Sequence, residues 1–204
     1  MRKIIGNLCM VFGAALVFGA LALFLYNQQE AQQAEQASAE LMVQLVEELE
    51  SIEQETLPLE VDIPRELLTE EDLKMTEVVI NGHAYIGYLS IPELELELPI
   101  MSDWNGRKLQ IAPCRYYGSL KGEDLVLMAH NYPKHFGLIK NLSEGDSVFF
   151  TDMDGNVTEY EVVGKDILDP YAVEEMTSGE FDLTLFTCTV GGASRVTVWC
   201  DFVK

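Results

Sequence analysis

The sequence predicts a mainly β domain of about eight short strands, closed into a barrel or folded as a sandwich, behind an N-terminal membrane helix and an acidic helical stalk. Three observations predict this arrangement. An uncharged stretch of 23 residues opens the chain, a Gln- and Glu-rich segment without Gly or Pro follows, and from position 75 apolar residues recur at every second position. A chain of 204 residues has room for one ordinary domain and these two accessory segments.

Residues 4–26 are long and apolar enough to cross a bilayer. They carry no charge, and about 20 apolar residues at 1.5 Å per residue span a hydrocarbon core of about 30 Å. Arg2 and Lys3 precede the stretch and acidic residues follow it, which predicts a single-pass cell-membrane protein with residues 1–3 cytoplasmic, residues 4–26 in the membrane and the β domain, residues 75–204, extracytoplasmic. A cleaved signal peptide is the alternative. Its apolar core is shorter, about 7–15 residues, and ends at a small-x-small site, so we favour an uncleaved anchor.

Residues 27–74 are predicted to form an acidic stalk and linker. Gln28–Thr56 is rich in helix-forming residues, and Pro58 and Pro64 follow its predicted end. Leu57–Lys74 is predicted to be a linker with a short acidic helix near Thr69. The helix carries an apolar stripe at helical spacing, formed by Leu41, Met42, Leu45, Val46, Leu49 and Ile52. The stripe either docks onto the following domain or belongs to a solvated helix that lifts the domain from the membrane; we favour the solvated helix.

Residues 75–204 are predicted to form the β domain. Met75–Ile80 and Ala84–Ile91 flank Asn81-Gly82, a dipeptide typical of a two-residue hairpin turn. Glu93–Leu98 alternates strictly between Glu and Leu, which predicts a strand with one buried face and one wet face. The other predicted strands are Leu125–Ala129, Ser147–Thr151, Val157–Asp166, Asp182–Cys188 and Arg195–Phe202.

Charge and cysteine spacing exclude some function classes. The chain has 34 acidic and 13 basic residues, a net charge of −21, and no basic run, so we expect no nucleic-acid partner. The cysteines at positions 9, 114, 188 and 200 form no C-x-x-C pair and show no spacing typical of zinc. His130 and His135 lack nearby carboxylates, so we expect neither a metal nor another cofactor.

Cys188 is the first candidate for chemistry because a predicted apolar strand carries it to its own C-terminal end. A short Gly-containing loop follows, and the next strand opens with Arg195. If the two strands pair antiparallel, Cys188 and Arg195 lie opposite each other, and a guanidinium there can stabilise an oxyanion or bind a carbonyl. On these residues alone, a buried structural cysteine beside a surface arginine is the commoner outcome.

The same register bears on disulfide pairing. Cys200 falls five residues beyond Arg195, about 17 Å along a strand. A disulfide needs Cα atoms within about 7 Å, so this register excludes a bond between Cys188 and Cys200. Cys200 alternates with Val196 and Val198 and is predicted to lie in the core, whereas Cys114 is predicted to lie in a loop.

A catalytic cysteine needs a partner, because a thiol with a pKa of about 8.5 is mostly protonated at neutral pH. His83 follows the predicted hairpin turn and is expected to be exposed, and His135 is expected in a loop. His130 ends the apolar strand Leu125–Ala129. Catalytic groups collect at such strand ends on a rigid scaffold, so His130 is a candidate for this role.

These residues resemble a known family. Thr184-Leu185-Phe186-Thr187-Cys188 resembles the T-L-x-T-C signature of sortases, with Arg195 where their last strand opens with arginine, and Asp124–Asn131 is similar to the strand that carries the sortase histidine. Further similar segments, between positions 84 and 204, are Gly87–Pro92, Leu98–Ile100 and Leu142–Asp146. Ala129 stands where glycine commonly precedes the histidine, and the loop Thr189–Ser194 is short, so the resemblance leaves the subclass open.

The resemblance implies an eight-stranded closed barrel with short helices, and a cysteine transpeptidase. Cys188 would attack the Thr–Gly bond of an LPxTG-like sorting signal in a secreted protein and form a thioester, and His130 would protonate the leaving amine. Arg195 would hold the substrate or the oxyanion. The acceptor would be the amine of a lipid-linked cell-wall precursor or a pilin lysine. Further candidates for substrate contacts are Thr187, Ala129 and Asn131.

Two other functions stay open at this point. One is a different extracytoplasmic cysteine peptidase or cell-wall transpeptidase. The Ser/His/Gly run before the nucleophile of L,D-transpeptidases is missing here, and papain-like enzymes place the cysteine before the histidine in the chain, the reverse of the order of His130 and Cys188. The other is a non-catalytic, membrane-tethered barrel used for binding.

Overall fold

The computed structural model describes residues 2–53, 69 and 71–203, and the chain forms two compact units, residues 1–33 and 34–204. The first unit belongs to the helix α1 (Arg2–Glu53). This helix is long and apolar enough to cross a membrane, with a mean hydropathy of 2.0 over 18 residues, none of them buried. The sequence predicts two helices here, and the structure has one. The residues around Asn27 include neither Gly nor Pro, so nothing in the sequence interrupts the helix. The predicted helix end at 54–56 and most of the linker lie outside the described residues.

In the second unit, the segment of α1 from Ala34 to Leu49 packs against the β domain. Four residues of the predicted stripe are buried: Leu41, Met42, Leu45 and Leu49. Leu45 shares a cluster with Tyr85 and Met101 of the β domain. At the polar edge of this contact, the Asn81 Nδ2 atom donates to Gln44 Oε1 over 3.2 Å. This packing corresponds to the docked alternative and not to the solvated helix that the sequence favoured.

Replacement of Leu45 by alanine is expected to destabilise the second unit by about 2–5 kcal/mol, because the side chain is fully buried and its removal leaves a cavity. Val43 lies on the same helix with 60% of its surface exposed, so Val43→Ala is the matched control and is expected to change stability little. Urea unfolding of the full chain in detergent, followed by the fluorescence of Trp104 and Trp199, measures both. Equal stability of the two variants would show that α1 does not stabilise the unit.

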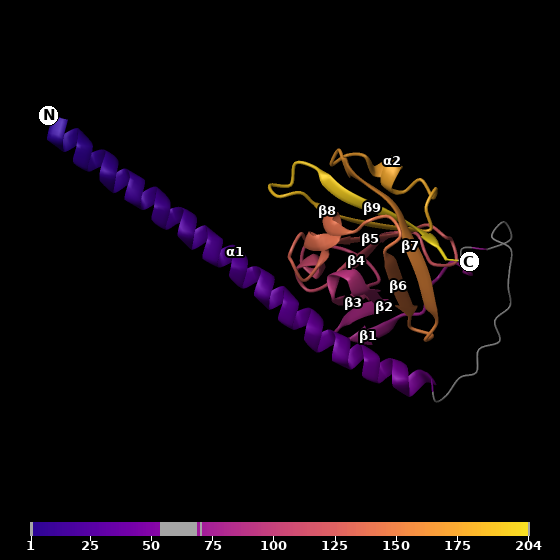
Figure 1. The fold of residues 1–204 in the computed structure, drawn as a ribbon. Coiled ribbons are helices and arrows are strands. Elements are labelled where there is room, and N and C mark those ends of the chain that lie inside the picture. Colours follow the sequence, from indigo (N-terminus) through magenta and orange to yellow (C-terminus); the bar gives the residue numbers. More distant parts are fainter. Residues whose placement is uncertain (1, 54–68, 70, 204) are drawn as a thin grey trace. The chain divides into compact units, whose positions relative to one another are not determined.

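The β domain is a closed barrel of eight strands with a ninth strand attached (Figure 1). The strands are β1 (Val78–Ile80), β2 (His83–Ile91), β3 (Leu96–Met101), β4 (Cys114–Tyr117), β5 (Leu125–Ala129), β6 (Ser147–Asp152), β7 (Val157–Leu168), β8 (Leu183–Cys188) and β9 (Arg195–Phe202). Neighbouring strands follow the order β2-β3-β4-β5-β8-β9-β7-β6, and β6 pairs with β2 to close the ring. The hairpin strand β1 extends β2 beyond the ring. Among the described strands, only β3–β4 and β5–β8 pair in parallel.

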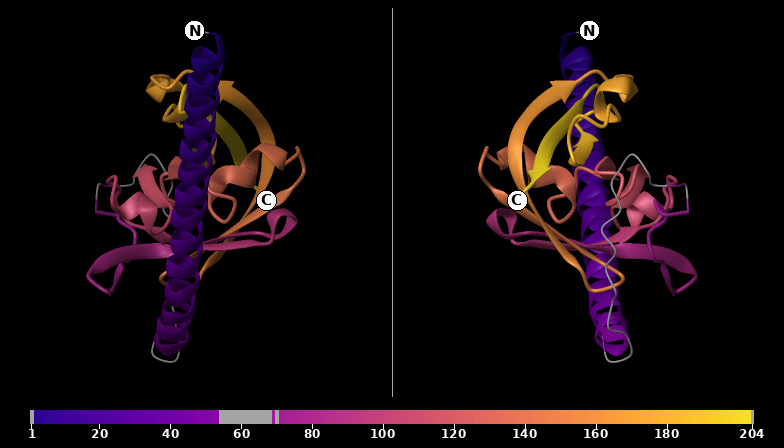
Figure 2. Two further views of the ribbon diagram at one scale, coloured as in Figure 1. Left: turned by 90° about the vertical axis from the view of Figure 1, so that its left-hand side faces the viewer. Right: turned by 90° about the vertical axis from the view of Figure 1, so that its right-hand side faces the viewer.

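Gly87 permits the closure of this ring. It lies where β2 pairs with both β3 and β6, at a register shift, with φ +143°. A Cβ atom at this position would lie 2.0 Å from the carbonyl oxygen of Thr151 on β6, so no other residue fits without moving one strand. The long strand β7 bends around the barrel at a second register shift, between Val162 and Gly164 (Figure 2).

The barrel interior is apolar. Its core includes residues from seven of the strands and from the short helix η4 (Phe136–Asn141), among them Ile86, Leu98, Leu127, Phe136, Phe150, Val162, Leu185 and Val198. The other short helices are η2 (Pro92–Leu94), η3 (Lys108–Gln110) and α2 (Val173–Met176). The packed interior leaves the strand ends and their loops as the places for chemistry.

Several strand predictions need correction. Glu93–Leu98 is not one strand: η2 covers its start, Glu95 adopts a left-handed conformation (φ 52°), and β3 begins at Leu96, because Pro92 starts a helical turn. Cys114 does not lie in a loop but begins β4, which pairs with β3 through a single residue pair, Met101 and Cys114. His83 is half-buried at the start of β2, where the strand shields it, rather than exposed.

Candidate active site

The ends of three neighbouring strands meet at the site. Within the ring, β8 lies between β5 and β9 (Figure 1). The parallel register of β5 and β8 pairs Ala129 with Thr187, so the next residues, His130 and Cys188, lie side by side. The antiparallel register of β8 and β9 pairs Cys188 with Arg195. Since neighbouring strands lie about 4.8 Å apart, Cys188 stands between His130 and Arg195 in one row.

Thr187 and Ala129 fix the first half of this row. The Thr187 hydroxyl donates to the carbonyl oxygen of Ala129 over 2.8 Å, between segments 58 residues apart in the chain. Both residues are buried, with 3% and 5% of their surfaces exposed. The bond therefore locks the ends of β5 and β8 together directly before His130 and Cys188.

The loop Thr189–Ser194 fixes the second half of the row. The Thr189 N–H donates to the Ser194 carbonyl oxygen over 2.9 Å, and the Ser194 N–H donates to Thr189 Oγ1 over 3.1 Å. The Nη1 atom of Arg195 donates to the carbonyl oxygens of Gly192 and Ser194, each over 3.2 Å. The loop thus holds the Arg195 guanidinium at the open end of the β8–β9 hairpin. The guanidinium has five N–H donors, so those on Nε and Nη2 can bind an oxygen of a substrate.

A cavity of about 480 Å³ opens beside Cys188. Thr187, Cys188 and Asn131 line it at the row, and the remaining lining residues are Gly137, Lys140, Lys165, Asp166, Ile167, Thr189, Val190 and Val196. Lys165 of β7 donates to the carbonyl oxygen of Lys140 over 2.7 Å and also bonds the Leu142 carbonyl, which ties η4 to β7 along this wall. The cavity volume lies within the range of about 300–1,000 Å³ that is typical of small-molecule sites.

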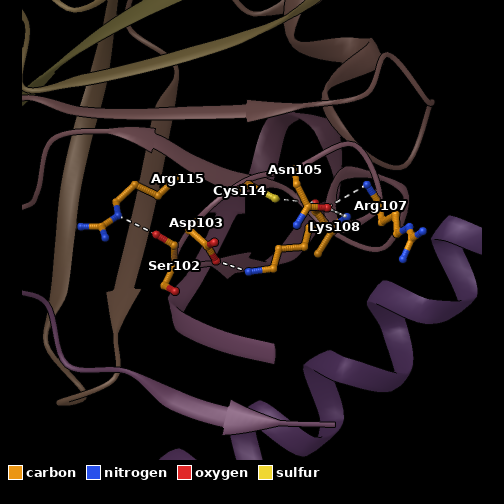
Figure 3. Close-up of polar contacts among 8 residues, drawn as sticks. Ser102, Asp103, Asn105, Arg107, Lys108, Cys114 and Arg115 are labelled. Carbon is orange, nitrogen blue, oxygen red and sulfur yellow. Dashed lines mark hydrogen bonds and ion pairs between the residues drawn. The ribbon is translucent and has the colours of Figure 1, made fainter. Parts of the chain in front are cut away.

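Accessibility separates Cys188 from Cys114 and Cys200, the other two cysteines of the β domain, and all three are free thiols. Cys188 is half-buried at the cavity, whereas Cys114 and Cys200 are buried. The Cys114 thiol donates to the Ala112 carbonyl oxygen over 3.5 Å (Figure 3), and burial raises its pKa to about 12. Burial also raises the pKa of Cys200 far above its ordinary value. Among the three cysteines of the β domain, only Cys188 has a thiol that is open to a substrate.

The surroundings of Cys114 are structural. Arg115 Nε donates to the Ser102 carbonyl oxygen over 2.8 Å, and Asn105 Oδ1 accepts the N–H groups of Arg107 (2.9 Å) and Lys108 (3.0 Å) (Figure 3). An ion pair joins Lys108 to Asp103 in the same segment. These contacts hold the connection between β3 and β4, and Cys114 itself is fully buried.

The predicted catalytic residues His130, Cys188 and Arg195 thus come together, and Asn131 and Thr187 lie at the cavity. Ala129 lies beneath the row and does not line the cavity. The wall formed by Lys140, Lys165, Asp166 and Ile167 is not predicted from the sequence. No local signal marks these residues, because η4 and β7 meet there only through the barrel fold. Within the described ranges, no group of three or more His, Cys, Asp or Glu side chains is arranged to hold a metal ion.

Comparison with known proteins agrees with this architecture. The family model of the sortase domain matches residues 89–203, more than half of the chain. Comparison with curated proteins gave no significant match. Among solved structures, sortase C1 from Streptococcus suis is similar with 28% identity and a TM-score of 0.54, over 60% of this chain and 74% of that one.

Two further solved structures share the fold. Sortase C from Streptococcus pneumoniae has 21% identity and a TM-score of 0.54, over 86% of this chain and 89% of that one. Sortase A from Corynebacterium diphtheriae has 22% identity and a TM-score of 0.55, over 60% of this chain but only 62% of that one, less than two thirds of its length. The matched residues 89–203 contain β5, β8 and β9 with the whole row of His130, Cys188 and Arg195, and by this match the chain belongs to the sortase family.

Proposed function

We propose that this protein is a membrane-anchored cysteine transpeptidase. It cleaves an LPxTG-like sorting signal between Thr and Gly and transfers the acyl group to the amine of a cell-wall precursor or to a pilin lysine. The observation that carries the proposal is the row of His130, Cys188 and Arg195 on adjoining strand ends beside the cavity. The apolar part of α1 supports an anchor that presents the domain outside the membrane, where secreted proteins and lipid-linked precursors are met.

In the acylation step, the Cys188 thiolate attacks the carbonyl carbon of the scissile Thr–Gly bond. The developing oxyanion is stabilised by Arg195, whose guanidinium the β8–β9 loop already orients. His130 gives a proton to the leaving amine, the C–N bond breaks, and the acyl group stays on Cys188 as a thioester. His130 follows β5 and Arg195 begins β9, the two strands on either side of β8. The general acid His130 and the oxyanion donor Arg195 therefore reach the reacting carbon from opposite sides.

In the transfer step, an acceptor amine attacks the thioester. His130 takes the proton from the amine, Arg195 again stabilises the oxyanion, and the C–S bond breaks to restore the Cys188 thiolate. Water in place of the amine would give hydrolysis.

The test is incubation of the full chain in detergent with peptides that carry an LPxTG-like signal, with and without an amine acceptor. We expect cleavage between Thr and Gly, and a product that joins the acyl part to the acceptor. Hydrolysis that no amine diverts would favour a cysteine peptidase instead. Absence of both cleavage and reaction with thiol-directed reagents would favour a binding barrel.

Replacement of Arg195 by alanine is expected to lower kcat by about 10²–10³-fold, the usual loss when one oxyanion donor is removed. Arg195→Lys keeps the charge but not the planar fork and is expected to recover only part of the loss. Steady-state peptide cleavage measures both variants. Lys121 lies on the loop between β4 and β5, so Lys121→Ala is the matched control for loss of one positive charge. Wild-type kcat in Arg195→Ala would remove Arg195 from the mechanism.

A further inference from the structure

His135 is a buried polar residue that the proposed mechanism does not use. It lies directly before η4, and no part of its surface is exposed. Its Nε2 atom lies 3.4 Å from Ser38 Oγ on α1, a residue 97 positions away in the chain. The Ser38 hydroxyl itself donates to the Ile111 carbonyl oxygen over 3.1 Å. A serine hydroxyl has one proton, and with that proton donated to the Ile111 carbonyl the Ser38 oxygen accepts, so we assign the imidazole proton of His135 to Nε2.

The position of Ser38 is fixed by the packing of α1. Ser38 is 4% exposed and lies one helical turn before the buried stripe that begins at Leu41. Burial, together with the charge of the neighbouring His130, lowers the pKa of His135 to about 4, although a hydrogen bond with the Ala34 backbone opposes the shift. His135 is therefore neutral at physiological pH and acts as a hydrogen-bond donor between the helix and the loop.

The backbone links His135 to His130 over a short closed loop. The Phe136 N–H donates to the carbonyl oxygen of His130 over 3.2 Å. The N–H groups of His135 and Gly137 both donate to the Tyr132 carbonyl oxygen, over 3.0 Å and 2.9 Å. A Cβ atom on Gly137 would lie 2.5 Å from the Asn131 carbonyl oxygen, so the loop is closed backbone against backbone. A shift of His135 must therefore move the residue that bonds His130.

The side chains form a second link. The Tyr132 ring contacts both histidines, with its centroid 5.0 Å from the ring of His130 and 5.6 Å from the ring of His135. Aromatic rings at these centroid separations are in packing contact, so each ring limits the rotation of its neighbour. The contacts run in order from Ser38 through His135 and Tyr132 to His130.

We propose that His135 is a positioning residue: held by Ser38 of α1, it fixes the loop 131–137 and with it the ring of His130 beside Cys188. The docked segment of α1 then contributes to catalysis by holding His135, rather than serving only as a spacer. The proposal rests on the proposed function for the role of His130. It gives His135 no contact with substrate and no share in proton transfer.

Four variants of the full chain in detergent test this role. His135→Phe keeps a ring but loses the N–H donor, and Ser38→Ala removes the acceptor. His135→Gln keeps a donor that reaches Ser38. Gln44→Ala is the control, because it removes a contact of the same helix that is exposed and remote from the loop.

We expect kcat for the sorting peptide to fall about tenfold in His135→Phe and in Ser38→Ala, with KM unchanged within about twofold, because misplacement of a catalytic group acts on the chemical step. His135→Gln and Gln44→Ala are expected to stay within about twofold of wild type. Assays are run at a temperature where unfolding curves show each variant folded. Wild-type kcat in both Ser38→Ala and folded His135→Phe, or an equal loss in Gln44→Ala, would overturn the proposal.

A second readout does not depend on sortase activity. NMR correlations of the His130 ring are expected to shift in His135→Phe and Ser38→Ala but not in Gln44→Ala. If wild type transfers no peptide, the proposed function fails, while the His130 signals still report on the coupling. Unchanged His130 signals in Ser38→Ala would overturn the coupling even if the peptide assay succeeds.

Discussion

Replacement of Cys188 by alanine is expected to abolish cleavage and transfer, with a loss of about 10⁴-fold or more, because no other group can form the thioester. The other two thiols of the β domain, Cys114 and Cys200, are buried, and burial raises the pKa values of both. Neither can substitute for Cys188. The half-buried position of Cys188 at the open end of β8 leaves the fold of Cys188→Ala intact, so thermal unfolding should match wild type.

The matched control is Cys114→Ala, which removes a thiol that donates only to the Ala112 carbonyl oxygen. This variant is expected to keep the kcat of wild type while folded, although its stability falls because Cys114 is fully buried. Peptide cleavage, followed by chromatography over long incubations, measures both variants. Wild-type turnover by Cys188→Ala would contradict the mechanism.

Replacement of His130 by glutamine is expected to lower kcat by about 10²–10⁴-fold, the usual contribution of a general acid. The rate falls because the amine leaves only when it is protonated, and in the proposed mechanism His130 supplies that proton. An aryl ester of the same peptide has a leaving group that needs no proton, so its acylation by His130→Gln is expected to be much less impaired.

His83→Gln is the control for loss of an imidazole, since His83 lies at the start of β2 and outside the row of strand ends. Its kcat is expected to match wild type with both substrates. Equal losses with the peptide and the ester in His130→Gln would show that His130 acts otherwise than by protonating the leaving amine.

The part of the site that the sequence predicts is the local part. Cys188 and Arg195 belong to one hairpin, so the loop length and the alternation of β9 suffice to place them opposite each other. The bounds predicted for β5 and β9 match the structure for the same reason: each is a clear apolar or alternating run with polar residues at its ends.

The contacts that the sequence does not predict join distant segments. From the residues alone, nothing places His130 beside Cys188, because the parallel pairing of β5 and β8 joins strands 58 residues apart. Only the resemblance to sortases predicts that His130 lies beside Cys188. His135 lies in a loop as predicted, but its burial is not predicted, because its partner Ser38 lies 97 residues away on a helix that the sequence favours as solvated. Strand β4 is not predicted because its four residues are too few to show an alternating pattern, and it pairs with β3 at only one position.

The thioester on Cys188 is the central claim, and intact-mass spectrometry tests it most directly. The full chain is mixed with a sorting peptide without acceptor amine and quenched in acid, which preserves a thioester. We predict a mass increase equal to the acyl part of the peptide, mapped to Cys188 by digestion and released by hydroxylamine. Peptide cleavage without any adduct, or an adduct mapped to another residue, would contradict the account.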